Sequence, residues 1–349
     1  MKMAATAPMK PSNIVENSFV KALAESSTLN SVPSHFSFAN DSTASHSDSI
    51  PVIDFSLLAS GTTHQRAKVL RDLDNACRDW GFFVLVNHGI PDSLLKNIKE
   101  ASLEYFELPE EDKWRYEAKS ASDPIKSAVA ASSIRPTTGF TCGGITSKST
   151  EVLLEYSERT RKLARKLVEA VFDALELEQD YVYQVLKLDS SFQIFATNFY
   201  PRCPEPDQAI GIHTHTDPDL FTFLIHNGVA GLQIEHNGHW FNADSLQNSI
   251  LVNAADQLQI LSNGRYKSVK HRAVVNSEKE RISIVVANGP AGEAVVGPAA
   301  PLVQKDGRPL YHSMKYVEYV ESQLTNSRVD GKSFLQHRMI DTSESEENL

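Results

Sequence analysis

The sequence predicts a mainly β protein with flanking helices, in which a helix-rich N-terminal region precedes an antiparallel barrel or sandwich such as a jelly roll. Three observations predict this class. Helical periodicity runs through the first half of the chain, short β-branched and aromatic runs replace it after about residue 190, and turn residues separate those runs with no helices between them. Many short strands at this spacing are typical of an antiparallel barrel or sandwich.

Composition narrows the class of protein. With 349 residues, of which 41% are hydrophobic and 22% charged, the chain can bury a substantial core. A net charge of -10, with no basic run longer than a pair, argues against a nucleic-acid partner. The three cysteines form no CxxC pair, so neither a disulfide framework nor a structural zinc site is indicated. The composition leaves the oligomeric state open.

The location expected for this protein is cytoplasmic. No apolar stretch approaches the roughly 20 residues that span a bilayer, and the start of the chain lacks a secretory pattern, so no membrane partner is expected. The first 50 residues are rich in serine but hold no arginine and four acidic residues, which is unlike a transit peptide.

The first half is predicted to begin with a flexible tail over residues 1–48 and to become ordered at Ile50-Pro51-Val52-Ile53-Asp54-Phe55. Apolar residues at steps of three and four indicate a helix through Leu70, Leu73, Cys77 and Trp80. The apolar run 82–88 after Gly81 indicates a buried strand. Further helices are predicted around 94–105 and 151–176.

The second half reads as strands joined by turns, three of which contain Asn-Gly, at 227–228, 237–238 and 263–264. The predicted strands are Gln193 to Tyr200, Leu220 to Ile225, Leu232 to His236, Ile250 to Asn253, Leu258 to Leu261, Ser268 to Val275 and Arg281 to Ala287. The chain is therefore divided into the tail, a helix-rich region 49–190, a core 191–292, a strand and helix segment 293–340 and an acidic tail 341–349.

A candidate metal site lies in this second half. His215 and Asp217 alternate along a presumed strand, so their Cα atoms would lie about 6.6 Å apart on one face. His271, 54 residues after Asp217, would supply a third ligand from a neighbouring strand. Two imidazoles and one carboxylate on one face leave the other coordination positions open, which is the arrangement of non-haem Fe(II) oxygenases.

The ordinary interpretation of these residues has to be weighed against the metal site. An isolated His-x-Asp is more often exposed or hydrogen-bonded than bound to metal. His213 offers a competing His-x-His spacing, but its Cα would lie about 13 Å from that of Asp217 in an extended strand, so His213 is not assigned as a ligand.

Two further pairs fit a dicarboxylic acid. Arg281 and Ser283 share one strand face, where a guanidinium can bind a carboxylate through two bonds and a hydroxyl can add a third. Asn198 and Tyr200 also share a face and offer an amide and a phenol as donors. Each pair alone is weak, since Arg-x-Ser is usually a solvated face and Asn-x-Tyr is often packing.

Together these motifs resemble the plant soluble 2-oxoglutarate- and iron-dependent dioxygenases, which include flavanone 3-hydroxylase, flavonol synthase and gibberellin oxidases. The resemblance rests on Asn198-x-Tyr200-Pro201, His215-x-Asp217, His271 and Arg281-x-Ser283, and on the phrases 256–264 and 50–54. It runs from about residue 17 to 335 and is most specific from 193 to 290.

The family implies a double-stranded β-helix core in which His215, Asp217 and His271 bind Fe(II). It also implies that Arg281 and Ser283, with Tyr200 and Asn198, bind the far carboxylate of 2-oxoglutarate. The expected reaction hydroxylates or desaturates a small specialised metabolite or hormone with O2 and yields succinate and CO2, with ascorbate as an optional further cofactor.

One segment departs from the family. Residues 127–150 replace a longer aromatic stretch that usually carries a Trp-Arg-Asp phrase, and they contain no tryptophan. Two alternatives stay open: a 2-oxoglutarate-independent oxidase of the same fold, whose substrate itself chelates iron, and a catalytically silent protein that binds a small molecule. A succinate assay with and without ascorbate distinguishes the 2-oxoglutarate-dependent enzyme from the oxidase, and binding of iron and ligand without succinate formation would favour the silent protein.

Overall fold

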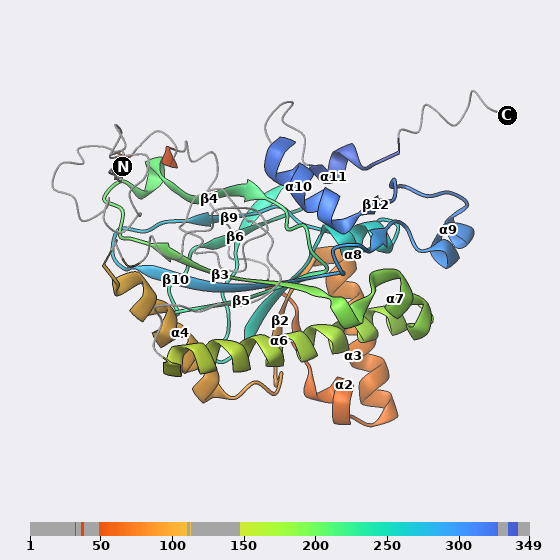
Figure 1. The fold of residues 1–349 in the computed structure, drawn as a ribbon, viewed down its shortest axis with the longest axis horizontal. Helices are drawn as coiled ribbons and strands as arrows, with labels where there is room; N and C mark the ends of the chain where they lie inside the picture. Colours follow the sequence, from red (N-terminus) through yellow and green to blue (C-terminus); the bar gives the residue numbers. More distant parts are fainter. Residues whose placement is uncertain are drawn as a thin grey trace, which may run out of the picture.

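Two stacked β-sheets with helices around them make up the fold (Figure 1). This computed structural model describes residues 32, 36–37, 49–109, 112, 147–326 and 334–340. The larger sheet has the order β1-β2-β8-β5-β10-β3 and the smaller one the order β4-β9-β6-β7. All pairs are antiparallel except β1 with β2. Such a pair of antiparallel sheets confirms the predicted jelly-roll class.

The bounds of the strands follow the predicted runs closely in most cases. The strands are β1 Val52–Asp54, β2 Phe82–Val86, β3 Phe192–Tyr200, β4 Ile210–His215, β5 Phe221–His226, β6 Leu232–His236, β7 His239–Asn242, β8 Ile250–Ala254, β9 His271–Val274, β10 Arg281–Gly289, β11 Val295–Val296 and β12 Met314–Lys315. Strand β9 begins at His271, three residues later than predicted. Strands β11 and β12 pair with each other outside the two sheets.

Both faces of the larger sheet are buried, and this explains why its central strands read as continuous apolar runs. In β2, Phe83 and Leu85 pack into the cluster shared with the helices, whereas Phe82 and Val84 pack with Ile234 of the smaller sheet. Successive side chains of a strand point to opposite faces, so a strand between two packed layers needs apolar residues at every position.

Helices cover the outer face of the larger sheet, with α3 and α6 beneath it in Figure 1. The helices are α2 Ser56–Ser60, α3 Thr63–Asn75, α4 Asp92–Glu107, α6 Ser147–Ala174, α7 Gln179–Leu186, α8 Asp256–Leu261, α9 Ala300–Asp306, α10 Tyr316–Asn326 and α11 Phe334–His337. A capping box formed by Thr62 and Gln65 starts α3, which continues as a π-helical turn, Ala76–Trp80. Gly81 ends that turn with a φ of 63°, a left-handed conformation that suits glycine.

One predicted strand is wrong. Residues 258–261 belong to helix α8, and Asn263-Gly264 follows the end of this helix instead of closing a hairpin. A short buried apolar run has the same composition in a helix and in a strand, so its periodicity does not separate the two. In contrast, Asn237-Gly238 joins β6 and β7 as a two-residue hairpin loop, with φ of 51° and 79°.

Several sequence predictions concern parts of the chain outside the described residues. These are most of the tail 1–48, the acidic tail 341–349 and residues 127–146 of the atypical segment. Within the tail, Ser37 forms an isolated bridge with Ala209. Residues 147–150 form the start of α6. Among the described helices, none is long and apolar enough to cross a membrane. The division into regions stays a prediction.

Candidate metal and co-substrate site

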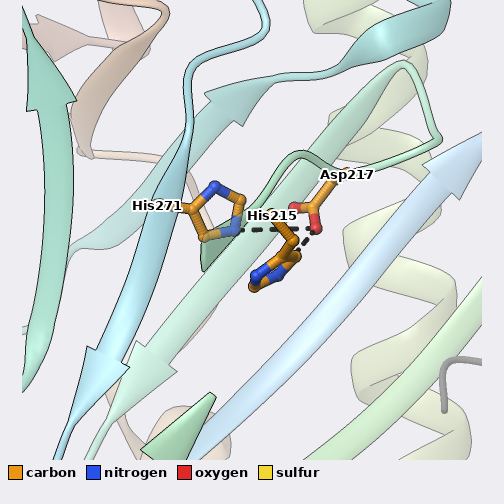
Figure 2. A group of neighbouring side chains, drawn as sticks. All are labelled: His215, Asp217 and His271. Atoms are coloured by element: carbon orange, nitrogen blue, oxygen red, sulfur yellow. Dashed lines mark ion pairs between the residues drawn. The ribbon is translucent and has the colours of Figure 1, made fainter. Parts of the chain in front are cut away.

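His215, Asp217 and His271 come together between the two sheets, as Figure 2 shows. One ligand atom from each residue lies within 4.8 Å of the other two. Each imidazole Nε2 is 3.6 Å from the same oxygen, Oδ1 of Asp217. Among the described residues this is the one cluster of His, Cys, Asp and Glu that could hold a metal ion.

Strand pairing and a bulge bring the two histidines face to face. Strand β4 pairs with β9 so that His215 lies opposite His271, and their ring centroids are 4.2 Å apart. The register shifts between Ile212 and His215, where three residues of β4 span two of β9. A β-bulge of this kind redirects a side chain and is frequent beside active sites.

Asp217 does not lie on the strand on which the sequence analysis placed it. Strand β4 ends at His215, so Asp217 lies in the irregular segment that follows and not on the same strand face. Its backbone carbonyl accepts a hydrogen bond from the N–H of Asp256 at 2.9 Å. Its second carboxylate oxygen, Oδ2, accepts from Nδ2 of Asn253 at 2.9 Å. These bonds leave Oδ1 directed at the histidines.

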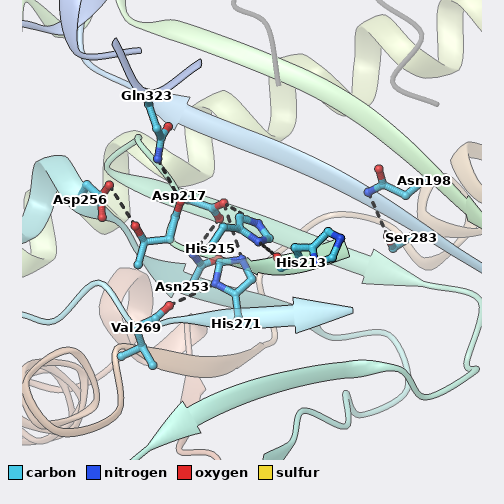
Figure 3. A network of polar contacts seen from close by, with 11 residues as sticks. Asn198, His213, His215, Asp217, Asn253, Asp256, Val269, His271, Ser283 and Gln323 are labelled. Atoms are coloured by element: carbon cyan, nitrogen blue, oxygen red, sulfur yellow. Dashed lines mark hydrogen bonds and ion pairs between the residues drawn. The ribbon is translucent and has the colours of Figure 1, made fainter. Parts of the chain in front are cut away.

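Backbone carbonyls orient both imidazoles. Nδ1 of His215 lies 2.7 Å from the carbonyl of His213, and Nδ1 of His271 lies 3.1 Å from the carbonyl of Val269 (Figure 3). Because a carbonyl can only accept, each Nδ1 is the donor of this bond, and each Nε2 is the ring nitrogen that faces Asp217. This is the arrangement by which metal-binding histidines are oriented. His213 thus contributes through its carbonyl.

The local electrostatics favour a neutral His215 and an ionised Asp217, which are the charge states that bind a metal ion. Burial, followed by the proximity of His271, lowers the pKa of His215 to about 4, so its ring is neutral at pH 7. For Asp217, burial opposes ionisation, but the two histidines and Asn253 outweigh it and the pKa falls below its usual value. The neutral imidazole of His215 and the carboxylate of Asp217 therefore face each other without a proton between them. A divalent cation fits this donor set, and iron suits it when other positions stay open.

A second group of polar residues lies on β3 and β10. In the antiparallel register Arg281 pairs with Tyr200 and Ser283 with Asn198, so the four residues predicted as two pairs form two rungs on one face of the sheet, with the Ile282–Phe199 pair between them. Nδ2 of Asn198 donates to Oγ of Ser283 at 3.2 Å. Figure 3 shows these two side chains to one side of the metal cluster.

Arg281 is buried without a carboxylate partner among the described residues. The side chain is 1% exposed, and its Nε and Nη1 have no hydrogen-bond partner. Its guanidinium carbon lies 4.9 Å from the centroid of the Tyr200 ring. Burial lowers the pKa of this guanidinium, although the group stays charged. A buried cation with unpaired donors is costly unless an anion joins it, so the fit to a carboxylate is good.

Two glycines make room for this group, and the sequence prediction missed both. A Cβ on Gly231 would lie 2.8 Å from Cδ of Arg281, and Gly231 has a φ of 156°. A Cβ on Gly211 would lie 2.6 Å from the ring of Tyr200. Such contacts are closer than real Cβ atoms tolerate, so glycine at these positions is a requirement of the site. Asn253 was also missed, because its contact with Asp217 depends on the pairing of distant strands.

Comparison with known proteins places these features in a family. Residues 191–290 match the model of the 2OG-Fe(II) oxygenase superfamily, and residues 50–133 match that of the non-haem dioxygenase in morphine synthesis N-terminal region. The chain is 40% identical over 304 residues to 2-oxoglutarate-dependent dioxygenase 19 of Oryza sativa subsp. japonica, covering 83% of this chain and 90% of that protein. The chain belongs to the 2OG-Fe(II) oxygenase superfamily.

Further proteins similar to this 2OG-Fe(II) oxygenase carry names or titles that mention different small molecules. It is 35% identical to flavanone 3-dioxygenase 2 of the same rice subspecies, over 77% of this chain and 82% of that protein. The structure of JOX2 in complex with 2OG, Fe and JA matches with a TM-score of 0.78 and 28% identity, covering 93% of this chain and 98% of that one. The protein is accordingly an Fe(II)- and 2-oxoglutarate-dependent dioxygenase, an oxidoreductase.

Proposed function

We propose that His215, Asp217 and His271 bind Fe(II) in this dioxygenase, and that Arg281 and Ser283, with Tyr200 and Asn198, bind the distal carboxylate of 2-oxoglutarate. The observation that carries the proposal is the convergence of three possible ligand atoms within 4.8 Å, with both imidazoles oriented by hydrogen bonds from Nδ1 to backbone carbonyls. The unpaired guanidinium of Arg281 supports the second half.

The substrate proposed is a small specialised metabolite or hormone, which the enzyme hydroxylates or desaturates. Its relatives include a flavanone dioxygenase and an oxygenase whose structure holds JA, so small organic molecules are the common class. The side chain of His215 is 28% exposed, against 9% for His271 and Asp217, so access to the metal cluster is from the side of His215.

Iron and 2-oxoglutarate, when bound, supply the oxidising chemistry, in which O2, 2-oxoglutarate and a substrate C–H bond give succinate, CO2 and a hydroxylated or desaturated product. The protein residues position these reactants. His215, Asp217 and His271 would hold the metal through two imidazole nitrogens and one carboxylate oxygen. Arg281 and Ser283 orient the co-substrate through its far carboxylate, and Tyr200 packs against the guanidinium.

The test is succinate formation by the purified protein with Fe(II), 2-oxoglutarate and a panel that contains a flavanone and a jasmonate. We expect 2-oxoglutarate-dependent succinate release, increased by the true substrate and lost in His215→Ala and Asp217→Ala. Omission of ascorbate tests the optional cofactor. Oxidation without succinate would instead indicate the 2-oxoglutarate-independent oxidase, and binding of iron and ligand without any turnover would indicate the silent binding protein.

A further inference from the structure

The C-terminal helix α10 directs three polar side chains at the segment that carries Asp217. Tyr316, Tyr319 and Gln323 follow one another at steps of three and four, so they share one face of the helix, named here the α10 polar face. Both tyrosine side chains are buried, at 1% and 0% exposure.

Two members of the α10 polar face bind residues of the segment 216–219, and the third binds Asp256, which itself contacts that segment. The hydroxyl of Tyr316 donates to Oδ1 of Asp219. Nε2 of Gln323 donates to the carbonyl of Thr216 at 3.2 Å, a contact visible in Figure 3. Two of the three side chains therefore bind residues on either side of Asp217.

The third contact passes through Asp256, which joins the helix to the Asp217 segment. The hydroxyl of Tyr319 donates to Oδ2 of Asp256 at 2.7 Å, and the same oxygen accepts from Oγ1 of Thr216 at 3.2 Å. The backbone N–H of Asp256 in turn donates to the carbonyl of Asp217. Removal of the tyrosine hydroxyl would thus loosen a residue that holds Asp217 by its main chain.

The fold places α10 firmly against this segment. Strand β12, just before the helix, pairs with β11, and the N–H of Tyr316 donates to the carbonyl of Ala294 at 2.9 Å. A Cβ on Gly289, at the end of β10, would collide with the Tyr316 hydroxyl. The helix start and the space for its first tyrosine are therefore both defined by residues far away in the sequence.

Because Asp217 lies beyond the end of β4, strand pairing does not hold it in place. Its own hydrogen bonds go to Asn253 and Asp256, and the α10 polar face binds Asp256 and the residues on either side of Asp217. We propose that Tyr316, Tyr319 and Gln323 are positioning residues that keep Asp217 in its metal-binding conformation. The inference rests on the proposed function, since it requires that His215, Asp217 and His271 bind the metal.

The experiment measures metal binding by the full-length protein without turnover. Co²⁺ is titrated anaerobically into the parent, Tyr319→Phe, Tyr316→Phe/Tyr319→Phe and Gln323→Leu, and the dissociation constant and the visible absorption of bound Co²⁺ are recorded. Residues that orient metal ligands typically contribute about 10- to 100-fold in affinity. We expect about a 10-fold weaker Kd for the double variant, smaller losses for the single ones, and an altered Co²⁺ spectrum.

Tyr266→Phe is the matched control. It removes an equally buried tyrosine hydroxyl that donates to a carboxylate, Oδ1 of Asp74 at 2.9 Å, away from the metal cluster. This control should lose thermal stability to a similar extent but keep the parent Co²⁺ affinity and spectrum.

The outcomes separate the two proposals. If the α10 variants match the parent in Kd and spectrum while His215→Ala loses Co²⁺ binding, the positioning role is overturned and the metal site stands. If Tyr266→Phe changes the Co²⁺ spectrum as much as the α10 variants, the effect is general destabilisation and the positioning role is likewise overturned. If His215→Ala binds Co²⁺ like the parent, the proposed metal site fails and the inference with it.

Discussion

Replacement of Arg281 tests the co-substrate site and makes an unusual prediction for stability. The guanidinium is buried, and Nε and Nη1 have no partner among the described residues. A hydrogen bond to a charged group contributes about 1.5–3 kcal/mol. Arg281→Lys keeps the charge but loses the planar fork, so we expect the loss of one such bond and about a 10- to 150-fold weaker affinity for 2-oxoglutarate.

Arg281→Met removes the charge altogether. Loss of both bonds corresponds to about 3–6 kcal/mol, so binding of 2-oxoglutarate should weaken by more than 100-fold. Without co-substrate, however, the same variant no longer buries an unpaired cation. The free energy of unfolding of the ligand-free protein should therefore rise by about 1–3 kcal/mol.

Titration calorimetry with 2-oxoglutarate and urea unfolding measure the two effects separately. Arg272→Met is a useful contrast, because Arg272 is equally buried but donates from Nε to Gln233 at 2.8 Å and lies 4.0 Å from the Trp240 ring centroid. That variant should lose stability. The reasoning is refuted if Arg281→Met is less stable than the parent without ligand, or if it binds 2-oxoglutarate within twofold of the parent.

Three other predictions follow from contacts around the site. Gly231→Ala should raise the KM for 2-oxoglutarate at least 10-fold, since its Cβ would displace Arg281, and steady-state succinate assays check this; a KM equal to that of the parent would contradict the steric argument. Asn253→Ala should weaken Co²⁺ binding by about 10- to 100-fold because Oδ2 of Asp217 loses its partner, and an unchanged Kd would show that Asn253 does not orient this carboxylate. Burial, with Arg281 and Lys99 nearby, lowers the pKa of His226 from 6.5 to about 4, so the unfolded chain takes up the proton first and the stability that His226 contributes falls as the pH drops from 6.5 towards 4. Urea unfolding measures the free energy of unfolding at pH 7 and at pH 5. From pH 7 to pH 5 this free energy should fall less in His226→Asn than in the parent, and an equal fall in both proteins would refute the role of His226.

The sequence predicted well whatever depends on local alternation. Arg281 and Ser283 had to share a face, as did Asn198 and Tyr200, because side chains alternate along a strand. That these two pairs are neighbours follows only from the pairing of β3 with β10, which lie 80 residues apart and contact each other through tertiary structure. The family resemblance supplied that link before the structure did.

The errors have a physical pattern too. Residues 258–261 were predicted as a strand because a buried apolar run carries no period of its own, and they form part of helix α8. Asp217 was placed on a strand that in fact ends at His215. The partners that hold Asp217, from Asn253 to Tyr319, come from elements distant in sequence, so no local pattern could have identified them.

The hydrogen bonds that orient the two imidazoles have a consequence for how this enzyme family can change. Both acceptors are main-chain carbonyls two residues before the histidine on the same stretch of chain. No side-chain replacement at 213 or 269 deletes an acceptor that every amino acid possesses. Side chains at these two positions can therefore be exchanged while the histidines keep their orientation, provided that the backbone of β4 and of the residues just before β9 keeps its course.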